Sequence, residues 1–143
     1  MRKFLVLLLA VAPAISWAGE MVVLTPAAEK SGARIALDLV AEKPYAGFEF
    51  VVNVPAGAKV DTSRCASDLP KGLDGACLYR AESNSVKFVV FMPAAGEMPA
   101  GRVAVGSLGV FAKGMNSADL TVTSVRFSDG LGVMRDASSV VAK

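Results

Sequence analysis

The segment Tyr45–Val54, with the sequence YAGFEFVVNV, constrains the fold more than any other stretch of the chain. Its residues alternate with a period of two, which is the side-chain period of a β-strand and does not fit a helix. One side of this strand carries Phe48, Phe50, Val52 and Val54, and the other side carries Glu49, Val51 and Asn53. Aromatic and β-branched residues suit a half-buried pleated surface. A second sheet must therefore cover the Phe side of the strand.

Other short segments of the chain have the same β character. They are Met21–Thr25, Arg34–Val40, Cys77–Ala81, Ser85–Met92, Arg102–Lys113, Leu120–Phe127 and Gly132–Asp136, and residues 137–143 either add an edge strand or fray. Turn residues separate these segments, and none of them has a convincing helical period. The pattern predicts an all-β fold: a two-sheet antiparallel β-sandwich of about nine strands, with a barrel as the alternative.

Two of these segments contain an irregularity. Gly106 and Gly109 interrupt the inward face of Arg102–Lys113, which predicts a bulge or a close approach of the backbone. In Leu120–Phe127 the inward positions change phase after Val122, which predicts a bulge near Ser124.

The N-terminus has the three parts of a secretory signal peptide. A basic start at residues 1–3 is followed by the apolar run Phe4–Ile15 and by small residues that end at Ala18. We expect cleavage after Ala18, so that residues 1–18 are the signal peptide and residues 19–143 form one domain, secreted or periplasmic. The apolar run is too short for a stable membrane anchor. A buried N-terminal helix is the alternative.

The charge of the processed chain excludes two classes of partner. Removal of Arg2 and Lys3 lowers the number of basic residues from 15 to 13, which equals the number of acidic residues, 13. A near-neutral domain without a basic run has no electrostatic footprint for nucleic acid, and it has no cationic amphipathic helix for a membrane surface.

The two cysteines, Cys65 and Cys77, are predicted to form a structural disulfide. An even number of cysteines in an exported chain favours a bridge. A redox or metal site would require C-x-x-C spacing or nearby His, and the chain contains no His.

The same absence of His removes Ser-His-Asp and Cys-His catalysis, and we predict that the chain is not an enzyme and uses no cofactor. Glu49 and Asp38 could act as paired carboxylates, but solvated surface positions explain both. Asp129 beside Gly130 could help to hold Ca²⁺, but a hairpin turn explains this pair without a metal.

Taken together, the segments resemble the cohesin family. The resemblance is carried by SGARIALDLV, by AGFEFVVNV, by the block from NSVKFVVFM to GVFAK and by LTVTSVRFSDGLGV, and it covers most of residues 21–133. It implies a nine-stranded β-sandwich of jelly-roll topology that binds a protein partner, a dockerin, or a relative that keeps this fold without that partner. It also implies that Tyr45–Val54 and Ser85–Met92 are neighbours in one sheet, on the face used for docking.

We therefore expect a binding face on the outward side of these two strands. It comprises Glu49, Val51 and Asn53 together with Lys87, Val89 and Phe91, an apolar centre with a charged rim. The alternative is that the irregular loop 56–76 covers this patch.

Two other functions compete with protein binding. Carbohydrate binding, with polysaccharide as the partner, would need exposed aromatic rings, and Tyr79 is the candidate because Tyr45 is expected to anchor the core strand. A pilin-like subunit completed by a donated strand would lack one strand at a sheet edge, and the strand count does not indicate this.

Overall fold

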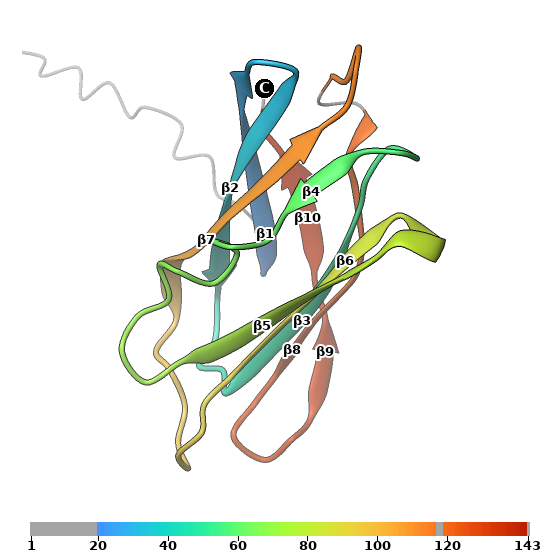
Figure 1. Ribbon diagram of the computed structural model, residues 1–143. Coiled ribbons are helices and arrows are strands. Elements are labelled where there is room, and N and C mark those ends of the chain that lie inside the picture. Colours follow the sequence, from blue (N-terminus) through green and yellow to red (C-terminus); the bar gives the residue numbers. More distant parts are fainter. Residues whose placement is uncertain (1–19, 117–118, 143) are drawn as a thin grey trace, which may run out of the picture.

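The structure is a computed structural model that describes residues 20–116 and 119–142, so the predicted signal peptide lies outside the described residues. The described residues form two five-stranded sheets that face each other (Figure 1). The first sheet has the order β10-β1-β2-β7-β4, with β1 at Met21–Glu29, β2 at Gly32–Ala41, β4 at Lys59–Asp61, β7 at Gly101–Phe111 and β10 at Ser138–Val141. The second sheet has the order β5-β6-β3-β8-β9, with β3 at Gly47–Asn53, β5 at Asp74–Arg80, β6 at Ser85–Phe91, β8 at Thr121–Ser128 and β9 at Met134–Asp136. A short 3-10 helix, η1 (Ala81–Ser83), joins β5 to β6.

The predicted all-β sandwich is confirmed, with two differences in detail. The described residues form ten strands rather than about nine, and β10 pairs with β1 in parallel, whereas the other pairs are antiparallel. The strand that the sequence did not indicate is β4, which has only three residues and therefore shows no alternation. The first strand also continues through Pro26, because β10 pairs with β1 only as far as Leu24 and proline is tolerated where a strand is an edge.

The core lies between the two sheets and is built on the predicted side of β3. Phe48, Phe50 and Val52 are at most 2% exposed, and Phe50 stacks on Phe88 of β6 with ring centroids 4.5 Å apart. Burial of one such Phe side chain contributes about 1.5 to 3 kcal/mol of apolar transfer free energy. Tyr45 is fully buried, as expected for a residue that anchors the start of this strand.

Both predicted irregularities are present. The β3–β8 register shifts between Glu49 and Val51, and Ser124 has the left-handed φ of 55°, so Val125 returns to the core side. The β2–β7 register shifts at Gly106, which also approaches the backbone of the loop between β4 and β5. A Cβ on Gly106 would lie 2.3 Å from the carbonyl oxygen of Arg64.

An ion pair fixes the first described residue to the second sheet. The Glu20 side chain is 8% exposed, and its carboxylate accepts hydrogen bonds from Nε and Nη2 of Arg135 on β9 at 2.5 and 2.6 Å. The Arg135 guanidinium also lies 5.7 Å from the ring centroid of Phe127. This bidentate pair raises the pKa of Arg135 and connects the N-terminal end of the described chain to β9.

Candidate functional site

The outer face of the second sheet brings together the six residues predicted on β3 and β6. In the register of the two strands, Glu49 lies opposite Val89 and Val51 lies opposite Lys87. Phe91 is 43% exposed and lies opposite Gly47. We use the term outer face for the side-chain surface formed by Glu49, Val51, Asn53, Lys87, Val89 and Phe91 and their outward neighbours on β5, β8 and β9.

Glu49 is the electrostatic centre of the outer face. Its carboxylate accepts a hydrogen bond from Nη2 of Arg126 on β8, and Nζ of Lys87 lies 4.0 Å away on β6. Further along β3, Nδ2 of Asn53 donates to Oγ1 of Thr121 at 3.1 Å. Charged groups from β6 and β8 therefore meet Glu49 on the central strand, where the sequence suggested an apolar centre, and the face is a mosaic of charged and apolar side chains.

A hollow of about 160 Å³ opens at one end of the outer face. Gly47 lies at its floor, Phe91 and Met134 stand on either side, and Val89 and Glu49 border it along the strands. Two small residues, Gly47 and Ser128, lie between Phe91 and Met134 in this row of the sheet. A cavity of this size holds one aliphatic or aromatic side chain.

The exposed large apolar side chains of the described residues all belong to this sheet or to the hairpin between β8 and β9. They are Leu78, Phe91, Leu131, Val133 and Met134, with exposed fractions from 43% to 91%. Figure 1 shows the hairpin projecting beyond the sandwich at the end of β8 and β9. Exposed apolar side chains that form a contiguous patch mark an interaction site more often than a plain solvated face.

Tyr79, predicted as an exposed sugar-binding ring, does not lie on the outer face. It is half-buried and packs against the core, whereas Leu78 beside it points outward and is 54% exposed. The reason is the period of two in β5, which places Tyr79 on the same side as Cys77. Because Cys77 must face the interior to reach Cys65, the sequence contained the signal that fixes the direction of Tyr79.

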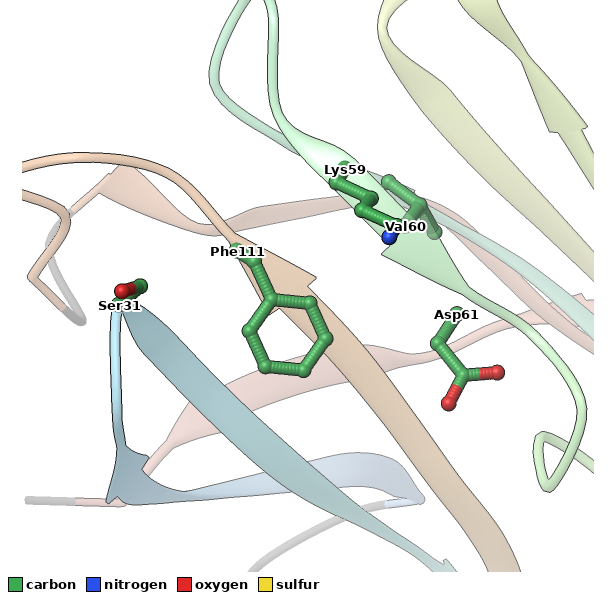
Figure 2. Close-up of a pocket in the computed structure, with 5 residues that line it drawn as sticks. All are labelled: Ser31, Lys59, Val60, Asp61 and Phe111. Atoms are coloured by element: carbon green, nitrogen blue, oxygen red, sulfur yellow. The ribbon is translucent and has the colours of Figure 1, made fainter.

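A second and larger hollow lies at the first sheet, where no site was predicted from the sequence. It has a volume of about 570 Å³ and is lined by Ser31, Lys59, Val60, Asp61 and Phe111 (Figure 2). In the close-up, the Phe111 ring lies between Ser31 on one side and Lys59 and Asp61 on the other. These residues come from the β1–β2 turn, from β4 and from the end of β7.

Asp61 is held in one position within this hollow. Its Oδ1 accepts hydrogen bonds from the backbone N–H and the hydroxyl of Ser63 at 2.9 and 2.6 Å, and its Oδ2 accepts one from Arg34 at 3.3 Å. These donors, those of Ser63 first, lower the pKa of Asp61 to about 2. The carboxylate is therefore ionised over the whole physiological range.

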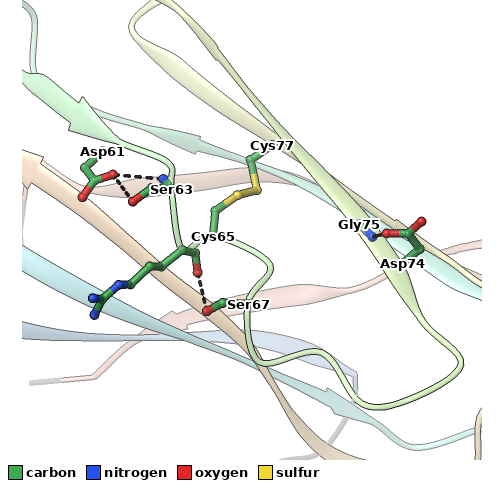
Figure 3. The surroundings of a disulfide bond; sticks show 8 residues. Asp61, Ser63, Cys65, Ser67, Asp74, Gly75 and Cys77 are labelled. Carbon is green, nitrogen blue, oxygen red and sulfur yellow. Dashed lines mark hydrogen bonds between the residues drawn. A yellow bond between two sulfur atoms is a disulfide. The ribbon is translucent and has the colours of Figure 1, made fainter.

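The predicted disulfide is present and joins the loop between β4 and β5 to β5 of the second sheet. Cys65 lies in the loop after β4 and Cys77 lies on β5, and Figure 3 shows the bridge between them. The loop is also hydrogen-bonded to β7, because Ser107 N–H donates to the Arg64 carbonyl at 2.8 Å and Asp68 N–H donates to the Val105 carbonyl at 3.1 Å. The loop thus closes the side of the sandwich between β7 and β5, and the alternative that it covers the outer face is wrong.

The described residues do not assemble a metal site, and Glu49 and Asp38 do not form a pair of carboxylates. They contain no cluster of three or more His, Cys, Asp or Glu positioned to hold a metal ion. Glu49 and Asp38 lie on different sheets, and Asp38 accepts a hydrogen bond from Arg102 at 2.7 Å. Asp129 accepts the N–H groups of Leu131 and Val133 at 2.9 Å each, so the hairpin accounts for its position.

No helix within residues 20–116 and 119–142 has the length and apolar character needed to cross a membrane.

The sequence matches no protein-family model and no curated protein, but the structure is similar to solved cohesin domains. It aligns with the cohesin of a type I cohesin–dockerin complex from Clostridium thermocellum at 15% identity and a TM-score of 0.58, over 86% of this chain and 88% of that chain. A type II cohesin module of the ScaA scaffoldin of Acetivibrio cellulolyticus aligns at 10% identity and a TM-score of 0.58, over 89% and 95% of the two chains. A non-cellulosomal cohesin from the archaeon Archaeoglobus fulgidus aligns at 12% identity and a TM-score of 0.57, over 87% and 88%. The resemblance to cohesins predicted from the sequence is confirmed at the level of the fold.

Proposed function

We propose that this protein is an exported, non-catalytic module that binds another protein through the outer face of its second sheet. The observation that carries the proposal is the gathering of the exposed large apolar side chains of the described residues on this sheet and its β8–β9 hairpin. The cohesin fold supports the same role, since two of the similar structures are complexes of a cohesin with a dockerin. We propose a dockerin-type partner on this basis.

The geometry of the outer face suggests how a partner is held. The hollow above Gly47 accepts one apolar side chain between Phe91 and Met134, which removes both of these side chains from water. Glu49 borders the hollow and can accept one further donor from the partner, beside Arg126. An apolar anchor in a pocket next to a charged group fixes both the affinity and the orientation of a bound protein.

Export is the second part of the proposal. The signal peptide at residues 1–18 would deliver residues 19–143 to an oxidising compartment, and the disulfide between Cys65 and Cys77 suits such a compartment. The location, secreted or periplasmic, decides which partners the module meets. N-terminal sequencing of the protein released by the producing cell tests this part, and the first residue is expected to be Gly19.

Substitution of Val89 tests the binding face. We expect the unmodified protein to be captured by immobilised dockerin modules, both those that bind type I cohesins and those that bind type II cohesins. Val89→Arg should abolish this capture because it places a charge beside the hollow. Ala36→Arg is the matched control, since Ala36 is an exposed strand residue that faces outward from the first sheet. Equal capture of both variants, or no capture of the unmodified protein by any dockerin, would contradict the proposal.

A milder variant separates loss of binding from loss of folding. Phe91→Ser removes a ring that is already 43% exposed, so the circular dichroism spectrum and the melting temperature should change little. Capture should nevertheless weaken about tenfold or more, as for an anchor residue of an interface.

A further inference from the structure

We propose that the 570 Å³ hollow beside Phe111 is a binding site for a neutral oligosaccharide, separate from the protein-binding face. The site lies at the first sheet, whereas the outer face belongs to the second sheet, so the two can be occupied independently. Its volume falls within the range of about 300 to 1,000 Å³ that is usual for small-molecule sites. The inference does not depend on the identity of the protein partner.

Phe111 supplies a fixed apolar surface. The ring lies over two glycines, because a Cβ on Gly32 or on Gly109 would each come within 2.9 Å of a ring carbon. The absence of these two side chains leaves room for the ring and defines its position. A sugar ring can pack its C–H groups against an aromatic face, whose negative potential attracts the slightly positive hydrogens.

The polar groups around the ring include both hydrogen-bond donors and hydrogen-bond acceptors, as recognition of sugar hydroxyls requires. Asp61 is an acceptor, Lys59 is a donor and Ser31 carries a hydroxyl that can donate or accept. Asp61 is already held by Ser63 and Arg34, so binding of a ligand does not require this carboxylate to be ordered anew. Each hydroxyl of a sugar can both donate and accept and therefore finds a complement here.

The charge balance of the site selects a neutral ligand. The two cations Arg34 and Lys59 are matched by the two anions Glu29 and Asp61, and Arg34 lies 3.2 Å from Glu29 and 3.3 Å from Asp61. The site therefore has no net charge, so an acidic ligand gains no net electrostatic attraction from it. A purely apolar side chain of a peptide would remove Asp61 and Lys59 from water without replacing their hydrogen bonds, which is costly.

Calorimetric titration of the processed protein tests the site. The probes are cellohexaose, xylohexaose and chitohexaose, and an oligogalacturonate of equal length serves as the acidic comparison. We expect saturable binding of at least one neutral probe and none of the acidic probe. The inference is overturned if no neutral probe binds, or if the acidic probe binds in preference.

Two variants locate the sugar on the structure. Phe111→Leu keeps an apolar side chain at the end of β7 but removes the aromatic face, and it should weaken binding about tenfold or more. Ala104→Arg, at an exposed position near the opposite end of β7, should leave the affinity for the sugar unchanged. Unchanged affinity in Phe111→Leu, or loss of binding in Ala104→Arg, would show that the sugar does not bind at Phe111.

Discussion

Removal of the disulfide by the double substitution Cys65→Ala and Cys77→Ala should destabilise the domain by about 3 kcal/mol. The bridge joins residues that are 12 positions apart, and the chain-entropy relation for a loop of this length gives about 3 kcal/mol at 25 °C. Because Cys65 belongs to a loop bonded to β7 and Cys77 belongs to β5, the lost constraint is one between this loop and the second sheet. The fold itself should persist, since the hydrogen bonds from Ser107 and Asp68 remain.

Urea unfolding followed by far-UV circular dichroism measures this loss. With a urea dependence of about 1 to 3 kcal/mol per M for a domain of this size, the midpoint should fall by about 1 to 3 M. The oxidised protein after treatment with a reductant should reproduce the midpoint of the double variant. If the urea midpoint falls by less than about 0.3 M, the reasoning is refuted, because the bridge then adds no constraint to those that the hydrogen bonds of the loop already impose.

Three further changes test other parts of the structure. Gly106→Val should destabilise the domain by about 1 to 3 kcal/mol in urea unfolding, because the new side chain meets the backbone of the disulfide loop, whereas Ala104→Val at an exposed position of the same strand should not. Glu20→Gln should cost about 2 kcal/mol by leaving Arg135 without its charged partner, and a thermal melt that matches that of the unmodified protein would contradict this. The Asp61 carboxyl should titrate at about pH 2 in an NMR experiment. Since its pKa is lowered on folding, its contribution to stability is complete above about pH 4 and is lost as the pH falls through 2. A titration midpoint near pH 4 would show that the hydrogen bonds from Ser63 do not form in solution.

The sequence predicted the sheets well because their strands alternate strongly. Phe48 and Phe50 could be placed in the core from their spacing alone, and the phase change between Val122 and Val125 located the bulge at Ser124. These features are encoded locally, in the residues that form them.

The parts that were not predicted depend on contacts between distant segments. The short strand β4 exists only because it pairs with the end of β7, so no alternation in Lys59–Asp61 indicated it. The Phe111 hollow was missed for the same reason, since β4 supplies three of its five lining residues. The side-chain direction of Tyr79 could have been derived from Cys77, but only by treating the disulfide as a constraint on the strand.

The central claim is that a protein partner binds the outer face of the second sheet, and chemical-shift mapping with an unlabelled dockerin module tests it most directly. We predict that the largest shift changes of the labelled protein fall on the amides of Glu49, Val51, Val89 and Phe91, while those around Phe111 do not change. Shift changes confined to the first sheet, or the absence of changes at saturating concentrations of dockerin modules of both types, would contradict the account.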